Sequence, residues 1–274
     1  MSYQAAVVPS GSVAFAQDVP YTGDALTAGI MLSAIQSVCS SAGWTSSGSK
    51  LTSVGTPGMN TKVSITLRVD TFNNVFIRPE IGGVAGPEFN CFLPPFYSLY
   101  YLWANKYGFY TRANVSDPVS LSFFRINALY VPTELQGTAV TGDMSFYLTR
   151  NSLAVFTVPR ACGTCVNGVV TQDPWGSTSG DFAPISHPMI YAGQGDVLTS
   201  NGRPVQQIPY VCLSNANNTE GKIGGLLCDS FISLTHSPDR SLATGPDGRT
   251  YYMWCGTDGT PGTVTHENLW LARS

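Results

Sequence analysis

Two cysteines with two residues between them, Cys162 and Cys165, have a spacing that suits redox or metal chemistry. A zinc site needs two further ligands, usually a second close pair, and the other cysteines and the histidines are isolated in the sequence. A thioredoxin-type pair opens a helix, whereas these cysteines lie among turn-forming residues. A local disulfide, half of a zinc site and two unpaired thiols all stay open for this pair.

The histidines and carboxylates follow no local pattern typical of catalysis. The histidines are expected in loops or beside a strand: His187, His236 and His266. The segment WGSTSG places Thr178 where a nucleophile elbow requires serine, and GQGDV lacks the third glycine of a dinucleotide loop. Paired acids for glycan cleavage, such as Asp239 and Asp247, need a separation that only the fold can set. We therefore predict a protein without catalytic residues, bound metal or cofactor.

Charged side chains are scarce throughout the chain. They make up 11% of the 274 residues, against roughly 25% in typical soluble domains. The net charge is −3, and the clustered basic residues that grip nucleic acid are missing. The N-terminus has no basic segment followed by an apolar run, and no segment reaches the roughly 18 continuous apolar residues of a membrane span. We expect no nucleic-acid partner, no membrane insertion, and a surface largely covered within an assembly.

One segment, residues 22–44 (TGDALTAGIMLSAIQSVCSSAGW), has helical periodicity. Asp24 suits the first helical turn and Gly43 can end the helix. The apolar residues that recur at helical spacing predict one buried stripe, consisting of Leu26, Ile30, Ala34, Ile35 and Val38. A helix with a single stripe and many serines is expected to pack on a larger element.

Most of the remaining sequence is typical of short strands joined as hairpins. KVSITLRV (62–69) alternates polar and apolar residues, and NNVFIRP (73–79) follows after an Asn-Asn corner. DMSFYLTRNSLAVFTV (143–158) has the pattern of two strands around a polar corner. The predicted fold class is mainly β, with antiparallel sheets in a sandwich- or barrel-like arrangement and one packed N-terminal helix.

The order of these elements predicts four segments. Residues 1–20 are expected to form an extended N-terminal arm that orders on binding. Residues 21–158 form a helix plus β domain, and residues 159–204 a turn-rich excursion or inserted lobe. Residues 205–274 supply C-terminal strands that complete the domain, ending in the pair GRTYYMWC and NLWLARS.

Aromatic residues are concentrated between residues 96 and 110. Core packing is the default explanation for such a segment, but tyrosine and tryptophan also dominate protein interfaces and sugar-stacking platforms. The candidates for an interface are Phe96, Tyr97, Tyr100, Tyr101, Trp103, Tyr107 and Tyr110.

Several segments follow one another in a recognisable order. They are a helix ending in SAGW, the strands VSITLRV and NNVFIRP, the hairpin MSFYLTRNSLAVFTV, and the closing strands GRTYYMWC and NLWLARS. This order resembles a loosely defined group of virion structural proteins of tailed bacteriophages. In that group a mid-chain hairpin with an Arg-Asn corner precedes a Gly-(Lys/Arg)-Thr-Tyr strand. The resemblance covers most of the chain and rests on no shared catalytic residue.

The resemblance implies a non-enzymatic component of the tail, collar, baseplate or capsid decoration. Such a protein is made in the host cytoplasm and resides in the virion, where its partners are copies of itself and other virion structural proteins. Two alternatives stay open. A receptor- or glycan-binding module of a fibre or spike would add a host-surface glycan as partner, and an enzyme that degrades surface polysaccharide would need acidic residues in a cleft.

Overall fold

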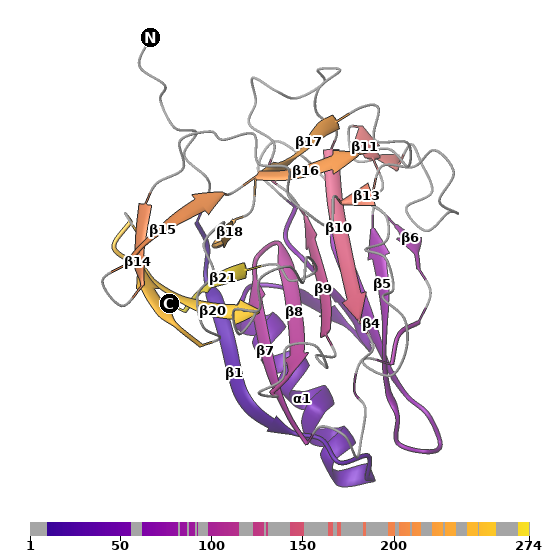
Figure 1. The fold of residues 1–274 in the computed structure, drawn as a ribbon. Helices are drawn as coiled ribbons and strands as arrows, with labels where there is room; N and C mark the ends of the chain where they lie inside the picture. The colour runs from indigo at the N-terminus through magenta and orange to yellow at the C-terminus, as the bar shows by residue number, and fades with distance from the viewer. Residues whose placement is uncertain are drawn as a thin grey trace.

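The structure, a computed structural model, is mainly β with one helix near the N-terminus of its described part (Figure 1). The strand pairs are antiparallel, so the predicted fold class is confirmed in its antiparallel sheets and its packed N-terminal helix. The structure describes residues 10–55, 62–81, 83–86, 88–90, 92, 98–114, 123–128, 130, 143–150, 164–166, 169–170, 183–184, 197–200, 203–208, 210–214, 221–226, 228–233, 240–245, 247–255 and 268–273.

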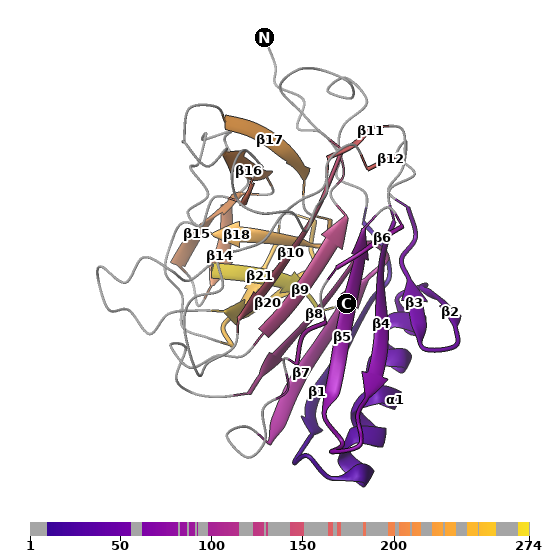
Figure 2. The same cartoon turned by 90° about the vertical axis from the view of Figure 1, so that its right-hand side faces the viewer.

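A seven-stranded sheet forms the central layer of the molecule, and Figure 2 shows it between two other layers. The N-terminal strand lies at one edge of this sheet and pairs with the strand that begins at Leu99. In spatial order the strands are β1 (Val13–Pro20), β7 (Leu99–Asn105), β8 (Gly108–Ala113), β9 (Phe123–Ala128), β10 (Asp143–Arg150), β11 (Thr164–Val166) and β12 (Val169–Val170).

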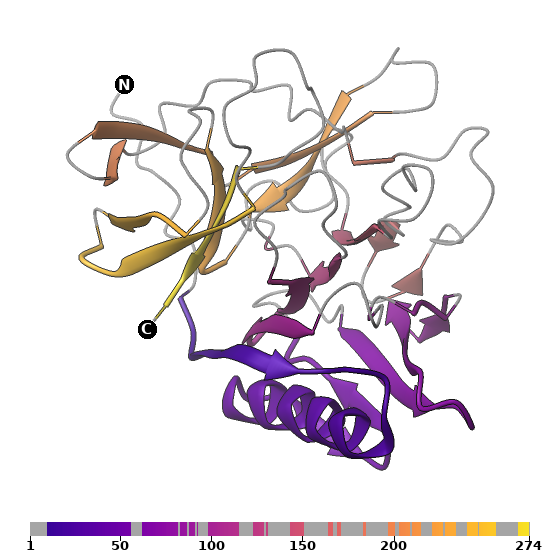
Figure 3. The ribbon, with the colours of Figure 1, turned by 60° about the horizontal axis from the view of Figure 1, so that its bottom comes forward.

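The second layer consists of α1 (Ala25–Ser41) and a five-stranded sheet. In spatial order this sheet contains β2 (Thr45–Ser47), β3 (Lys50–Thr52), β4 (Val63–Val69), β5 (Val75–Ile81) and β6 (Val84–Ala85). Figure 3 shows α1 lying along β1, with the strands of the five-stranded sheet beside it. The main hydrophobic core lies between this layer and the central sheet, because both contribute buried apolar side chains to it.

The third layer lies on the opposite face of the central sheet and comes from the C-terminal part of the chain. Six of its strands pair in circular order, since β14 pairs with both β15 and β19. They are β14 (Val197–Ser200), β15 (Arg203–Ile208), β18 (Ser230–Ser233), β21 (Asn268–Ala272), β20 (Thr250–Cys255) and β19 (Leu242–Thr244). A three-stranded sheet adds β13 (Ala183–Pro184), β16 (Tyr210–Ser214) and β17 (Gly221–Leu226).

Local signals explain where α1 begins and ends. Asp24 is the N-cap, and its carboxylate accepts a hydrogen bond of 2.8 Å from the backbone N–H of Thr27. Gly43 adopts a φ of 93°, and the N–H of Trp44 donates to the carbonyl of Cys39, so the chain leaves the helix in a glycine-terminated turn. Asp24 is predicted in the first turn of the helix, but it is the residue directly before that turn.

The predicted apolar stripe of α1 is wrong at its N-terminal half. Leu26 is 75% exposed and Ile30 is 39% exposed, although Ile35 and Val38 are buried as predicted. The helix carries apolar residues on two sides. In its N-terminal half the side that faces the core contains Met31, and the side with Leu26 and Ile30 faces outward. The buried side chains of α1 are Ala28, Met31, Ile35, Val38 and Cys39.

The hairpin of β4 and β5 confirms the prediction made for residues 62–79. Val63, Ile65 and Leu67 are buried, and β4 pairs with β5 in a continuous register from Val63–Ile81 to Val69–Val75. The corner contains Asn73 at a φ of 65°, a backbone conformation that asparagine tolerates well. The predicted terminal pair is also found, as β20 and β21.

Two predicted segment assignments change. Residues 13–20 are not a free arm but strand β1, because Ala14 and Ala16 pack against the core and the strand pairs with β7. Short strands from residues 159–204 join larger sheets, with β11 and β12 extending the central sheet. The first strand of the 143–158 hairpin is β10, and its second strand lies outside the described residues.

Strands β7 and β8 place aromatic side chains on both faces of the central sheet. Because side chains alternate along a strand, Tyr100 points toward α1 and the main core, whereas Trp103 points toward the C-terminal layer. The Trp103 ring stacks on Tyr110, its direct partner in β8, with centroids 4.8 Å apart. Its indole N–H donates a 2.8 Å hydrogen bond to the carbonyl of Ala272. The sheet is therefore buried on both faces at this point.

Replacing Trp103 with alanine should destabilise the fold strongly. The ring is fully buried, and truncating a buried tryptophan lowers the free energy of unfolding by about 3–5 kcal/mol. Phe72→Ala is the matched control, because Phe72 is 78% exposed and its truncation should change stability by less than about 0.5 kcal/mol. Urea unfolding of the two variants measures the difference, and a Trp103→Ala protein as stable as the control would contradict this packing.

Candidate functional site

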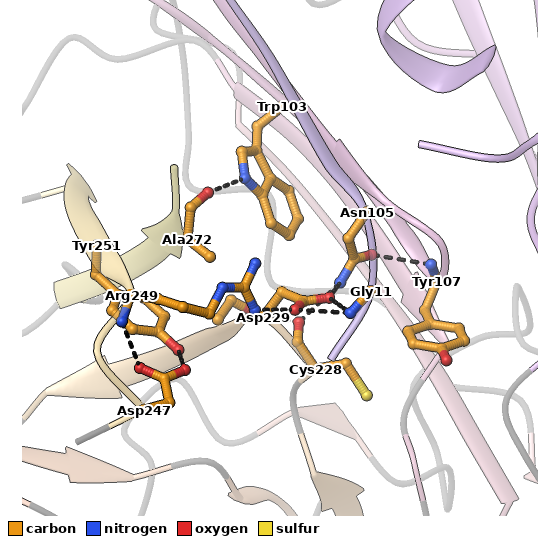
Figure 4. Close-up of polar contacts among 11 residues, drawn as sticks. Gly11, Trp103, Asn105, Tyr107, Cys228, Asp229, Asp247, Arg249, Tyr251 and Ala272 are labelled. Carbon is orange, nitrogen blue, oxygen red and sulfur yellow. Dashed lines mark hydrogen bonds and ion pairs between the residues drawn. The ribbon is translucent and has the colours of Figure 1, made fainter. Parts of the chain in front are cut away.

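The side chain of Asp229, which precedes β18, makes polar contacts with three other residues (Figure 4). Its carboxylate accepts hydrogen bonds of 3.1 and 3.2 Å from the N–H of Gly11 and one of 3.2 Å from the side-chain amide of Asn105. It also forms an ion pair with the guanidinium of Arg249. We call Gly11, Asn105, Asp229 and Arg249 the Asp229 junction, and it joins three distant parts of the chain.

The Asp229 carboxylate is fully buried, with a side-chain exposure of 0%. A buried charge is tolerated only when hydrogen bonds and an opposite charge replace its hydration, which the three donors provide here. Its backbone adopts a φ of 55°, and its carbonyl accepts a 2.9 Å hydrogen bond from the N–H of Ala272 in β21. Both the side chain and the backbone of Asp229 thus hold neighbouring strands in place.

Asn105 at the end of β7 uses its polar groups in the same way. Its amide nitrogen also donates 2.8 Å to the carbonyl of Cys228, and its side-chain oxygen accepts 2.9 Å from the N–H of Tyr107. The backbone carbonyl of Asn105 accepts 2.7 Å from the indole of Trp44. This residue therefore connects the β7–β8 turn, the C-terminal layer and the chain that follows α1.

Arg249 contacts two carboxylates, those of Asp229 and Asp247. Burial disfavours its charge, but the hydrogen bond to Asp229 and the charge of that carboxylate outweigh burial and raise the pKa of Arg249. The neighbouring Asp247 accepts hydrogen bonds of 3.0 Å from the N–H of Arg249 and 2.8 Å from the hydroxyl of Tyr251. Burial, followed by this contact with Asp247, raises the pKa of Tyr251. These groups are engaged with one another as a structural network.

A second cluster surrounds Tyr101 on the same face of the central sheet. Phe15 from β1 stacks on the Tyr101 ring at 6.0 Å, and Tyr252 from β20 lies 6.3 Å from it. The guanidinium carbons of Arg112 and Arg240 lie 5.1 and 5.8 Å from the ring centroid, within cation–π range. The ring contacts of this cluster join the N-terminal strand to the C-terminal layer at a second place, in addition to the Asp229 junction.

The structure places five of the interface candidates inside the chain, which confirms core packing, the default explanation for this segment, and rules out contact with neighbouring molecules for them. They contact other parts of the same chain, because β7 and β8 are covered by the core on one face and by the C-terminal layer on the other. The same burial removes them as a platform for stacking sugars. The buried candidates are Tyr100, Tyr101, Trp103, Tyr107 and Tyr110.

Other sequence candidates lie largely outside the described residues. These are Phe96, Tyr97, Cys162, Asp239 and the three histidines. Cys165 lies in β11, but Cys162 lies outside the described residues, so the local disulfide between them stays a prediction. Asp247, considered for glycan cleavage, contacts Arg249 and Tyr251. Within the described ranges, no group of three His, Cys, Asp or Glu side chains could hold a metal ion.

Sequence reasoning missed the Asp229 junction completely. Gly11 and Asp229 alone are 218 positions apart, and no member belongs to a motif. The available signal was indirect: Asp229 interrupts an apolar segment, GLLCDSFISL, in a chain with few charges. A lone carboxylate in such a segment is expected to have buried partners, but the sequence does not say which.

Comparisons with protein-family models, with curated proteins and with solved structures found no significant match. Among the helices that the structure describes, none is long and apolar enough to cross a membrane.

Replacing Asp229 with asparagine should loosen the junction. Asparagine keeps the shape and tolerates the positive φ, but it leaves Arg249 without its carboxylate partner. Breaking a buried pair lowers the free energy of unfolding by about 3–5 kcal/mol, and the lower end is expected because Arg249 is partly exposed. Asp247→Asn is the control and should lower it by about 1 kcal/mol or less. Equal effects of the two variants in urea unfolding would refute the junction's importance.

Alkaline pH should weaken the fold through Tyr107. Burial, followed by electrostatic interactions with Cys228 and Asp229, raises the pKa of Tyr107 to about 12 from its ordinary value of 10.0. Between these values the unfolded chain loses a proton that the folded chain keeps, so stability falls as pH rises. Unfolding midpoints measured from pH 9 to 12 should decline less steeply in Tyr107→Phe than in the wild-type protein. Identical slopes would contradict the raised pKa.

Proposed function

We propose that this protein is a non-enzymatic structural component of a tailed-bacteriophage virion, assembling with copies of itself and with other particle proteins of the tail, collar or baseplate. The order of segments that resembles such proteins and the low charge of the chain support this proposal. The observation that carries it is an exposed apolar end of the molecule. This apolar end consists of Leu26, Ile30 and Phe72.

The members of the apolar end come from α1 and from the corner between β4 and β5, which meet at the N-terminus of α1. Leu26 lies in the first turn of α1, and Phe72 lies in the β4–β5 corner. The hydroxyl of Tyr21, just before α1, donates 2.9 Å to the carbonyl of Asn73, which brings that corner to the helix. This contact therefore places the corner that carries Phe72 beside the N-terminal turn of α1.

Exposure of this kind favours burial against another molecule. Leu26 is 75% exposed and Phe72 is 78% exposed, and each apolar Å² removed from water contributes roughly 25 cal/mol to association. Clusters of exposed large apolar residues mark interaction sites in soluble proteins. The polar groups of the interior, by contrast, are used to hold strands together at the Asp229 junction. The polar groups of the interior thus bind other parts of the same chain, whereas the exposed apolar residues are suited to contact with another molecule.

Particles purified from the culture that produces this chain provide the test. The protein should occur in intact particles in many copies, as measured by mass spectrometry after density-gradient purification. Phe72→Asp should lower its incorporation while leaving its melting temperature unchanged, because an exposed charge opposes apolar contact. Thr244→Asp, at an exposed position of β19, is the control and should incorporate normally.

Two results would overturn the proposal. One is the absence of the chain from particles whose other structural proteins are recovered. The other is turnover of a polysaccharide by the purified chain, which would make it an enzyme.

A further inference from the structure

The exposed face of α1 carries no charge at all. None of the residues of Ala25–Ser41 is Asp, Glu, Lys or Arg, although the helix lies at the surface of the described structure. Surface helices normally place charged residues on the face that meets water. This face instead exposes Leu26 and Ile30 in its N-terminal half, and Gln36 with four serines in its C-terminal half: Ser33, Ser37, Ser40 and Ser41.

Gly29 in the middle of α1 has no explanation inside the chain. Glycine weakens a helix interior relative to alanine because of its backbone freedom. A Cβ atom at Gly29 would meet nothing within 4 Å, so no neighbouring group of the same chain requires glycine there. A glycine that leaves room on an exposed face suits close approach by another backbone. Gly29 therefore leaves the exposed face open to close approach by another molecule.

The two halves of the face differ in character. The N-terminal half presents the large apolar side chains of Leu26 and Ile30, and the C-terminal half presents polar side chains, most of them small serines. A second copy of α1 in antiparallel orientation places Leu26 of each helix over Ser40 of the other. The midpoint of Ala25–Ser41 is Ser33, so each Ser33 would lie near the symmetry axis and near its own copy.

The charges at the two ends of α1 also favour an antiparallel copy. Asp24 caps the N-terminus, and Asp70 lies in the corner whose Asn73 carbonyl contacts Tyr21. Lys106 lies beside Gly43 at the other end, and it has no ion pair within the part of the chain that the structure describes. Antiparallel packing brings the acidic end of one copy toward the basic end of the other. A parallel arrangement would place like charges together.

We propose that the exposed face of α1 packs against the same face of a second copy across a two-fold axis near Ser33. This inference rests on the proposed assembly function, for which it names one contact between copies. A helix of 17 residues is about 26 Å long, so one pair of helices buries less than the roughly 1,600 Å² of a standard stable interface. The contact is therefore weak in the free protein and becomes effective when it is repeated in a particle.

Sedimentation velocity of the full-length protein over a concentration series tests the contact. Ser33→Arg should weaken self-association by more than about tenfold, because it places two positive charges at the axis. It should not unfold the chain, since arginine is a better helix former than serine. Thr244→Arg adds the same charge to exposed strand β19 and should associate like the wild-type protein.

Two further variants sharpen the test. Ser33→Cys should yield a disulfide-linked dimer under mild oxidation, above the background of the wild-type protein, whereas Thr244→Cys should not. Gly29→Ala should raise the melting temperature through its better helix propensity and yet weaken self-association, because its methyl group occupies the close contact.

Each other outcome overturns the proposal. Self-association that is unchanged in Ser33→Arg shows that copies meet through another surface, while the proposed assembly function stands. Normal self-association combined with lost incorporation of Ser33→Arg into particles shows that α1 contacts a different particle protein. A wild-type protein that stays monomeric up to high micromolar concentration and gives no Ser33→Cys dimer also overturns it, and recovery from particles then decides the function separately.

Discussion

The buried carboxylate of Asp229 is the constraint on which the rest of the structure depends. A charge without exposure to water requires donors around it, and this chain supplies them from its N-terminal segment, its central sheet and its C-terminal layer. Because Gly11 lies 218 positions before Asp229, satisfying this one carboxylate fixes both ends of the chain against the same sheet. The cluster around Tyr101 adds a second attachment of β1 to the C-terminal layer. The buried polar groups of the Asp229 junction thus hold strands of the same chain together.

The central sheet can be covered on both faces because of the composition of β7 and β8. Tyr100, Leu102 and Ala104 face the main core, while the alternate residues face the C-terminal layer. Trp103 fills that second interface and ends in a hydrogen bond to Ala272, so its polar N–H is satisfied where its ring is buried. A sheet that is buried on both sides leaves the outer surfaces of the molecule, including α1, to meet other molecules. That division between interior and surface supports the proposed role in assembly.

The sequence allowed correct prediction wherever the determining contacts are local. The hairpin of β4 and β5 follows from alternation and an Asn-Asn corner, and the bounds of α1 follow from Asp24 and Gly43. Prediction failed where several faces were equally apolar. In α1, Leu26 and Ile30 fit the helical spacing as well as Met31 does, so periodicity could not decide which side is buried. In β7, aromatic residues on both faces gave no sign that the C-terminal strands cover one of them. The Asp229 junction has no local pattern at all.

Amide hydrogen exchange of the native protein, resolved by residue, tests most directly whether the junction locks the ends of the chain to the sheet. The N–H groups of Gly11, Tyr107 and Ala272 all donate within it, to Asp229 or to Asn105. If the junction opens only when the whole molecule unfolds, these three amides exchange with the free energy of global unfolding. We expect that common value for all three amides. Rapid exchange at Gly11 beside slow exchange at Tyr107 and Ala272 would contradict it, because the N-terminal segment would then move independently of the sheet.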